Sequence, residues 1–242
     1  MNVLVVGAGS MGQWFARTVR DHAEVSVAFA DTDAEAATAA AEAVGGRAVS
    51  TATEERFDAV CVAVPMPVAE AAIESYADRA TALLDVTGVM TEPLAAMREH
   101  APDSQRASLH PLFAPDNAPG NVAVVTDADG QVVETLLGAL AAAGNRTFET
   151  TAQEHDAAME TVQAAAHAAV LAYGLAAADV SERFHTPVSG ALADLVEQVR
   201  GGDARVYADI QATFDGADRV ADAAARIADA DRAEFTDLYD SL

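Results

Sequence analysis

Lysine is absent from this sequence of 242 residues, and its 14 basic residues are all arginine. They stand against 38 aspartates and glutamates, so the formal net charge is −24 at neutral pH. Nucleic acids and anionic membranes repel a chain this acidic, and we expect neither as a partner. The acidic residues are spread along the chain rather than collected in a tail, which indicates the acidic surface of a folded protein.

Cysteine, long apolar runs and a leader segment are also scarce or missing. The single cysteine, Cys61 in an apolar stretch, cannot form an internal disulfide, and we expect a buried, unreactive thiol. No apolar run is long enough to span a bilayer, and no basic region followed by a hydrophobic segment opens the chain. These absences predict a cytoplasmic protein, whose dense carboxylates are similar to those of halophilic proteins.

A glycine-rich turn near the N-terminus carries the strongest functional signal. The apolar run Val3–Val6 leads into a Gly-x-Gly-x-x-Gly turn, and a helical pattern follows. In a dinucleotide-binding unit the first glycine permits the tight turn, the second lets a pyrophosphate approach, and the third lets the helix pack on the sheet. The pyrophosphate then sits at the helix N-terminus. The candidate cofactor-binding residues are Gly7, Gly9, Ser10, Met11 and Gly12.

An acidic residue at the end of the second predicted strand indicates which dinucleotide binds. Asp31 follows the strand pattern Val25–Ala30 and is placed to accept hydrogen bonds from both ribose hydroxyls. Its charge would repel a 2′-phosphate, so NAD is favoured over NADP. Asp33 is the alternative for that role.

Strand and helix patterns alternate through the first 150 residues. This alternation predicts an α/β domain over residues 1–150, a doubly wound parallel sheet of Rossmann type. From Gln153 onward helical periodicity is nearly continuous, which predicts an all-α domain over residues 151–242. The predicted strands are Val3–Val6, Val25–Ala30, Ala48–Ser50, Ala59–Val64, Ala82–Val86, Arg106–Leu109 and Val122–Thr126, and the clearest helices between them are Ala34–Val44, Val68–Tyr76 and Gln131–Ala143.

Two predicted strands end in residues suited to a nucleotide crevice, because the carboxyl ends of parallel strands line it. Val64 and Pro65 follow the fourth strand, and Thr87 and Gly88 follow the fifth. We expect all four near the ribose or the nicotinamide of the cofactor. For Thr87 and Gly88, an ordinary strand-to-helix turn explains the pattern equally well.

A histidine at the end of the sixth predicted strand is the candidate general base. Pro111 follows His110 directly, and a proline holds its predecessor extended and stiffens the loop beyond. Imidazole accepts a proton near neutral pH, so His110 is suited to general-base catalysis, although a structural histidine fits the same pattern.

A polar stripe marks the first helix of the second domain. At 100° per residue its members fall within about 60° of one another, so they face either solvent or a site. We expect the two deeper ones, Gln163 and His167, to face the crevice. The acidic helix start suits capping, and we prefer that role to a catalytic one for His155. The stripe consists of Asp156, Glu160, Gln163 and His167.

These motifs together resemble the prephenate dehydrogenase family, which includes the arogenate dehydrogenases of tyrosine synthesis. The resemblance runs essentially from end to end. Its middle block, a His-Pro-x-Phe-x-Pro turn followed by a Glu-His-Asp helix start, is rather specific. The residues that carry it are Gly7 to Gly12, Asp85 with Pro93, Leu94 and Met97, His110 to Asp116, Glu154 to Asp156, His167 with Ala172 to Leu175, and Tyr207 to Ile210.

The resemblance implies NAD-dependent oxidative decarboxylation of prephenate to 4-hydroxyphenylpyruvate. It also implies that His110 accepts the proton of the substrate hydroxyl, that His167 lines the pocket, and that the helical domain forms a homodimer. The substrate would be a small anion with Gln163 and Arg200 as candidate ligands. We expect no metal and no second activity fused ahead of Met1.

The chain departs from the family pattern at two places that bear on substrate binding. Gly88-Val89-Met90 stands where the family usually carries Ser-Val-Lys. Gly190 and Gln198 stand in a segment where the family presents arginines. A dianionic substrate needs cationic partners, preferably bidentate ones. The arginines that could supply the charge from shifted positions are Arg183, Arg200 and Arg205.

Three alternatives stay open. Arogenate, which bears an amino group, would want an acid in the pocket, and Glu160 is a possible partner. Hydroxyacid dehydrogenases and imine reductases share a Rossmann domain followed by a helical dimer domain, but the absence of lysine weighs against their lysine-dependent members. A non-catalytic nucleotide-binding regulator is motivated by Gly88, Met90 and Gly190.

Overall fold

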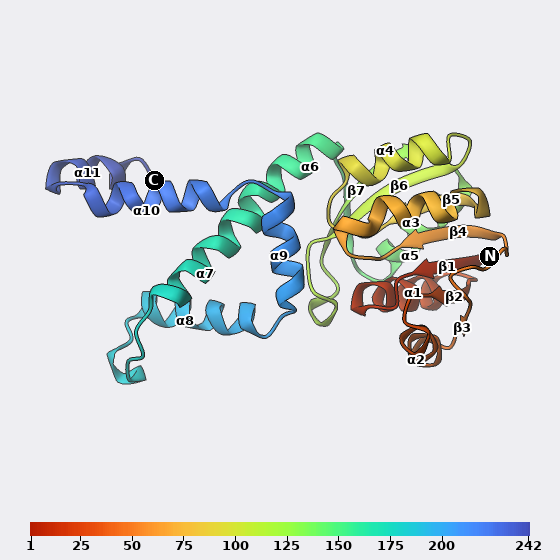
Figure 1. The fold of residues 1–242 in the computed structure, drawn as a ribbon, viewed down its shortest axis with the longest axis horizontal. Helices are drawn as coiled ribbons and strands as arrows, with labels where there is room; N and C mark the ends of the chain where they lie inside the picture. The colour runs from red at the N-terminus through yellow and green to blue at the C-terminus, as the bar shows by residue number, and fades with distance from the viewer. The chain divides into compact units, whose positions relative to one another are not determined.

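The computed structural model describes every residue, Met1–Leu242, and the chain divides into two compact units (Figure 1). Unit 1 comprises Met1–Asp156 and unit 2 comprises Ala157–Leu242. The division falls after Asp156 rather than after residue 150. Side chains at the start of the helix that begins at Ala152, including His155, are buried among the residues of unit 1.

Unit 1 is built on one eight-stranded sheet of order β3-β2-β1-β4-β5-β6-β7-β8, which confirms the predicted α/β fold of Rossmann type. Neighbouring strands are parallel except β6 and β7, which are antiparallel. The sheet is therefore mostly parallel, and only β7 and β8 run opposite to the other strands. The segment between β6 and β7 holds only a single 3-10 turn, so no crossover helix brings the chain back to a parallel start. The strands are β1 Asn2–Val6, β2 Ser26–Ala30, β3 Arg47–Ala48, β4 Phe57–Val62, β5 Ala80–Asp85, β6 Gln105–Pro111, β7 Asn121–Ala128 and β8 Arg146–Glu149.

Strand β8 has no counterpart among the predicted strands. It is four residues long, lies at the edge of the sheet and carries mostly exposed side chains. A short polar edge strand has no buried face, so no hydrophobic alternation marks it in the sequence. Strand β8 pairs with β7 in parallel, in a register that begins with Asn121 opposite Arg146.

Helices cover both faces of this sheet, as a doubly wound fold requires. Side chains of β1 alternate: Val3 and Val5 join one apolar core with α1, α2 and α5, while Leu4 and Val6 join a second core with α3 and α4. The single cysteine, Cys61, is buried in the first core, as expected. The helices are α1 Ser10–His22, α2 Ala34–Val44, α3 Ala69–Tyr76, α4 Thr91–His100 and α5 Gln131–Ala142, with 3-10 turns η1 Met66–Val68, η2 Ala77–Arg79 and η3 Pro115–Asn117.

Unit 2 is entirely helical, as expected from the continuous helical periodicity. Helix α6 enters it from unit 1 and continues through a π-helical segment, η4, into α7. Side-chain caps start three of the later helices: Thr186 and Asp231 form capping boxes and Asp203 caps α9. The elements are α6 Ala152–Met159, η4 Glu160–Ala165, α7 Ala166–Ala176, η5 Glu182–Phe184, α8 Pro187–Arg200, α9 Ala204–Thr213, α10 Ala217–Asp229 and α11 Arg232–Asp240.

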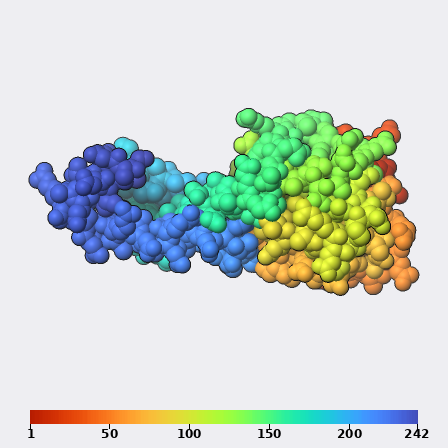
Figure 2. Space-filling model, turned by 90° about the horizontal axis from the view of Figure 1, so that it is seen from above, coloured from red at the N-terminus to blue at the C-terminus, as the bar shows by residue number.

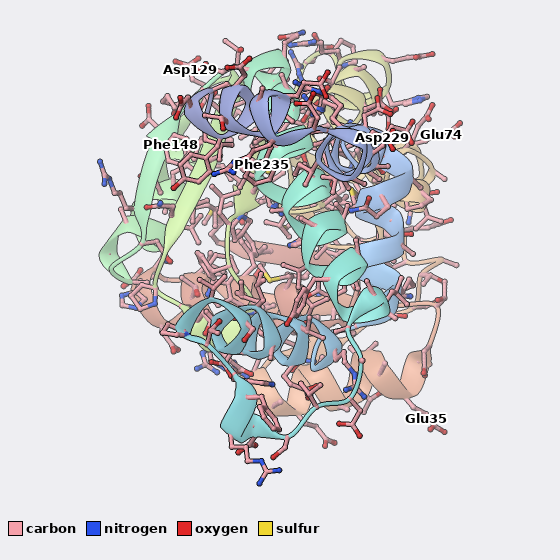
Figure 3. The ribbon with its side chains drawn as sticks, turned by 90° about the vertical axis from the view of Figure 1, so that its left-hand side faces the viewer. Glu35, Glu74, Asp129, Phe148, Asp229 and Phe235 are labelled. Atoms are coloured by element: carbon pink, nitrogen blue, oxygen red, sulfur yellow. The ribbon has the colours of Figure 1, made fainter.

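Unit 2 buries few of its apolar side chains. Its buried apolar residues are Met159, Ala164, Ile210 and Phe214. Large apolar side chains stay exposed on several helices, among them Phe235 of α11, which is labelled in Figure 3. Helix α11 lies alongside α10 (Figures 1 and 2). No helix is both long and apolar enough to cross a membrane. The other exposed large apolar residues of the unit are Val162, Leu175, Val180, Phe184, Val188, Leu195, Val206, Ile227, Tyr239 and Leu242.

Candidate active site at the carboxyl ends of the strands

The glycine-rich turn between β1 and α1 has the shape that a dinucleotide requires. Gly7 has a φ of +104°, and a Cβ there would collide with the carbonyl oxygen of Ala63. A Cβ on Gly12 would collide with the carbonyl oxygen of Gly7. Around Gly9 no atom lies within 4 Å of the position of a Cβ, so open space remains there. The outer glycines therefore serve backbone packing, and the middle one leaves room for a ligand.

Helix α1 starts without a side-chain cap. Gly9 is its N-cap residue, and Ser10 and Met11 form the first turn. The amides of a first helical turn have no intrahelical acceptor, and the helix dipole favours an anion there. Together with the open space at Gly9, this fits a pyrophosphate held by backbone amides.

Asp31 lies between this turn and the start of α2. Its Oδ2 accepts a hydrogen bond from the amide of Ala8 at 2.7 Å, and its Oδ1 accepts one from the amide of Asp33 at 2.9 Å. Asp33 instead caps α2 by accepting from the amides of Glu35 and Ala36. The alternative role for Asp33 is thus taken up by helix capping, and Asp31 is the carboxylate beside the glycine turn.

A hollow of about 320 Å³ beside Asp31 bears on the choice between NAD and NADP. Its polar lining residues, besides Asp31, are Thr32, Thr38, Ser50 and Thr51, and no arginine is among the residues that line it. A 2′-phosphate binds where arginine or lysine accommodates it. The residues that line this hollow would present hydroxyl groups and the negative charge of Asp31 to a 2′-phosphate, and no positive charge.

The residues after β4 and β5 lie at the same edge of the sheet, in different local roles. Val64 reaches within 3.2 Å of the position of a Cβ on Gly7, and Pro65 precedes the η1 turn. The Thr87 hydroxyl donates to Asp85 Oδ1 at 2.8 Å, so its side chain supports the turn itself. Gly88 has a φ of +98°, and a Cβ there would lie 3.5 Å from His110 Nε2.

Asp85, at the end of β5, is a fully buried carboxyl group. Burial raises its pKa to about 7, despite hydrogen bonding with Ser108 and Thr87, which opposes the shift, and the charge of Asp156 raises it further. Close to neutral pH this group is divided between its neutral and charged forms.

The candidate base His110 belongs to a chain of three side chains. His110 Nδ1 lies 2.8 Å from Nε2 of His155, and His155 Nδ1 lies 2.8 Å from Asp156 Oδ1. The two rings meet edge to face with centroids 5.0 Å apart. His155 is only 3 % exposed. The preference for helix capping at His155 is therefore wrong: Thr151 caps α6, through its hydroxyl to the amide of Glu154.

The far end of this chain is fixed to a helix N-terminus. Asp156 Oδ1 and Oδ2 accept hydrogen bonds from the amides of Met90 and Thr91, each at 3.0 Å, at the start of α4. Burial would raise the pKa of Asp156, but hydrogen bonds from His155, Thr91 and Met90 outweigh it and hold the pKa below its ordinary value. Burial, and then the neighbouring His155, lower the pKa of His110 to about 3, with Asp156 opposing them. His110 is therefore neutral at neutral pH, and the His155 ring lies between it and the charged Asp156.

The loop after His110 links it to the nucleotide helix. The Phe113 ring packs edge to face on Trp14 of α1, with centroids 5.3 Å apart. Pro111, which lacks an amide proton, is the last residue of β6, beyond the final pairing of that strand with β5 at Ser108. The loop that follows the candidate base is thus anchored, through Phe113, to the helix that starts at the glycine turn.

The polar stripe, which starts at Asp156 of unit 1 and continues into unit 2, does not follow regular α-helical spacing. The π-helical turn over Glu160–Ala165 is wider than an α-turn, so residues after it are rotated relative to those before. Asp156 binds the start of α4, and Glu160 pairs with Arg219 of α10 at 3.0 Å. The assumed 100° per residue is therefore wrong here, and these two acids have separate partners.

The three expected site residues of unit 2 lie in different environments. Gln163 is half-buried within the π-helical turn. The His167 ring packs edge to face on Tyr207 of α9 at 4.9 Å, and burial lowers its pKa. Arg200 is 71 % exposed and pairs with Glu197 at 2.8 Å. Of the other arginines considered, Arg183 lies over the Phe184 ring and Arg205 lies beside Asp203.

Comparisons with known proteins agree with this arrangement. Residues 15–134 match the family described as prephenate dehydrogenase, nucleotide-binding domain. A 4-amino-4-deoxyprephenate dehydrogenase of Streptomyces pristinaespiralis is 34 % identical over 233 residues, which cover 89 % of this chain and 78 % of that protein. The chain therefore belongs to the prephenate dehydrogenase family, a family of nucleotide-dependent oxidoreductases of aromatic amino acid biosynthesis.

Two solved structures share the fold. Prephenate dehydrogenase from A. aeolicus, in complex with hydroxyphenyl propionate and NAD+, matches with a TM-score of 0.69 and 17 % identity, covering 87 % of this chain and 81 % of that one. Arogenate dehydrogenase from Synechocystis matches with a TM-score of 0.56 and 17 % identity, covering 100 % and 97 %. At this identity the likeness concerns the fold.

Proposed function

We propose that this protein catalyses the NAD-dependent oxidative decarboxylation of prephenate to 4-hydroxyphenylpyruvate. The observation that carries the proposal is the hydrogen-bonded set His110, His155 and Asp156 at the edge of the sheet where the glycine turn and Gly88 also lie. A buried, neutral imidazole with an ordered partner is suited to accept the proton of an alcohol as a carbonyl forms.

The glycine turn and Asp31 hold the cofactor in this proposal. Bound NAD supplies the acceptor for the hydride. The amides of Ser10 and Met11 at the start of α1 bind the pyrophosphate, and Asp31 binds the ribose hydroxyls. The hollow beside Asp31, lined without an arginine, supports NAD over NADP.

His110 is the catalytic residue and acts at its Nε2 atom. The substrate hydroxyl donates to Nε2 and transfers its proton there, so electron density moves onto the ring carbon as its hydride leaves. When the ring carboxylate departs as carbon dioxide, the bonding pair enters the ring and makes it aromatic. Gln163, His167 and Arg200 are the proposed ligands of the substrate, and Arg200 would exchange Glu197 for a substrate carboxylate.

4-Amino-4-deoxyprephenate is a second candidate substrate. It is favoured by the 34 % identity to a dehydrogenase of that name over 89 % of this chain. An amino group in place of the hydroxyl also donates a proton to a neutral imidazole. His110, His155 and Asp156 can therefore act on either substrate. Arogenate differs instead in the side chain of the ring.

A panel of three substrates tests the proposal. Prephenate, 4-amino-4-deoxyprephenate and arogenate are each supplied with NAD, and NADH and carbon dioxide are measured. The proposal expects the highest kcat/KM with prephenate; a higher value with the amino compound would move the assignment to the second candidate. His110→Asn should lower kcat ~10²- to 10⁴-fold while NAD binding persists, and His22→Asn, an exposed histidine, is the control. No turnover of any of the three by the wild-type protein would overturn the proposal.

We propose in addition that unit 2 pairs with a second copy of the chain. A helical unit with four buried apolar residues and exposed rings such as Phe184 and Phe235 has little core of its own. Exposed apolar surface of this kind marks an interaction site. The family resemblance supports a homodimer as the occupant.

A further inference from the structure

We propose that His155 is a positioning and proton-holding residue for His110: fixed by Asp156, it selects the tautomer of His110 and takes over the positive charge when the substrate proton arrives. The protonation part of this inference rests on the proposed function, whereas the tautomer part does not. His155 and Asp156 both lie in unit 1 with His110.

Hydrogen-bond polarity along the chain of side chains follows from its fixed end. Asp156 already accepts from the amides of Met90 and Thr91, so it is a carboxylate and can only accept from His155 Nδ1. A neutral His155 then has its lone pair on Nε2, which accepts from His110 Nδ1 at 2.8 Å. His110 is thereby held with its proton on Nδ1 and its lone pair on Nε2, the atom that lies toward Gly88.

The same geometry gives the accepted proton a second position. When the O–H bond of the substrate breaks, the N–H bond forms at His110 Nε2 and the ring becomes cationic. The His110 Nδ1–H bond then breaks as the His155 Nε2–H bond forms across the 2.8 Å contact, which moves the charge to the ring that touches Asp156. The reverse transfers return a proton from His110 Nε2 to the phenolate left by decarboxylation. No proton is gained or lost over the cycle.

Burial explains why the charge needs this second position. A cationic His110 would sit in a site that strongly disfavours it, as the pKa of about 3 indicates. On His155 the same charge lies 2.8 Å from a carboxylate that two backbone amides hold in place. The titratable groups whose charges act on His110 are His155 and Asp156, and Asp156 in turn acts on Asp85 at the end of β5.

Histidine ring ¹⁵N spectra of the apo protein test the tautomer. The wild type should show His110 protonated at Nδ1. His155→Gln should preserve this state, because its Oε1 can accept in place of the ring Nε2. His155→Phe, which removes the acceptor, should shift His110 toward the Nε2–H form. His22→Asn is the matched control. A wild-type His110 protonated at Nε2, or an unchanged tautomer in His155→Phe, would overturn the inference.

Kinetics separate orientation from proton holding. His155→Gln keeps the acceptor but cannot take a proton, so kcat should fall ~10²-fold with KM little changed. A wild-type kcat in His155→Gln would refute proton holding. If the wild-type protein turns over none of the substrates but its spectra show His110 protonated at Nδ1, the proposed function is wrong and the tautomer inference stands.

Discussion

At the scale of single residues, two buried groups of unit 1 have pKa values shifted in ways that make stability depend on pH in opposite directions. Burial raises the pKa of Asp85 from 3.8 to about 7, so its contribution is present at low pH and is lost as the pH rises through 7. Burial lowers the pKa of His110 from 6.5 to about 3, so its contribution is present above pH 6.5 and is lost as the pH falls toward 3. Between pH 3.8 and pH 6.5 the free energy of unfolding falls with pH because of Asp85 and rises with pH because of His110, so the two effects offset each other in the wild type.

Asp85→Asn should remove the contribution of Asp85 and leave that of His110. Asparagine keeps an acceptor for Thr87, cannot ionise, and offers a donor to the Ser108 hydroxyl. Because a pKa unit corresponds to about 1.4 kcal/mol, the free energy of unfolding above pH 7 should rise relative to wild type by up to roughly 4 kcal/mol. The difference should vanish near pH 4. Urea unfolding of the apo protein across this range measures it, with the exposed Asp103→Asn as control; equal stability of variant and wild type at pH 8 would contradict the expectation.

At the scale of elements, the junction of β2 and α2 separates two neighbouring carboxylates by role. Asp33 caps α2, while Asp31 accepts the amide of Ala8 in the glycine turn. The sequence offers both as ribose ligands, and the start of the helix decides between them. The preference for NAD should therefore depend on position 31 alone.

Asp31→Asn tests this separation of roles. Loss of the charged acceptor should weaken NAD binding about 10- to 100-fold, since a hydrogen bond to a charged group contributes about 1.5–3 kcal/mol, and should narrow the difference between NAD and NADP. Asp33→Asn is a matched control, because asparagine caps helices as well as aspartate does. Calorimetric titration of both variants with NAD and NADP measures the effect. Equal losses in the two variants would show that the assignment to Asp31 is wrong.

At the scale of the whole molecule, two properties have opposite effects on the association of two copies. The net charge of −24 opposes association, and the exposed apolar side chains of unit 2 favour it. Acidic side chains cover both units, and Glu35, Glu74, Asp129 and Asp229 project from the surface in Figure 3. Two chains of the same sign repel each other, and at 0.1 M salt this repulsion is largely screened beyond about 10 Å. Association of two copies should therefore strengthen with ionic strength.

Sedimentation across a salt series tests the homodimer. The wild-type chain should be dimeric, with a dissociation constant that falls as salt rises. Leu175→Asp, at a side chain 89 % exposed on α7, should shift the protein toward monomer. Val68→Asp introduces the same charge at a half-exposed position of unit 1 and should leave the dimer intact. A monomeric wild type at every salt concentration, or equal effects of both substitutions, would argue against pairing through unit 2.

Features that depend on local interactions could be predicted from the amino-acid sequence alone. The glycine turn, the alternation of strands and helices up to α5, and the helical second unit all follow from residue spacing, glycine conformation and capping. Asp31, beside the glycine turn, was found in this way, and His110 was placed at the end of its strand. The polar edge strand β8 and the direction of β7 were not, because the first has no buried face and the second depends on the pairing partner.

Contacts between residues far apart in the sequence depend on how the chain packs in three dimensions. His155 lies 45 residues after His110, and no local pattern reveals that β6 and the start of α6 bring their rings within hydrogen-bond distance. The pKa of Asp85 depends on burial between strands, and the π-helical turn over Glu160–Ala165 breaks the spacing that a helical projection assumes. Desolvation and hydrogen bonding between remote segments are properties of packing, so a one-dimensional pattern does not contain them.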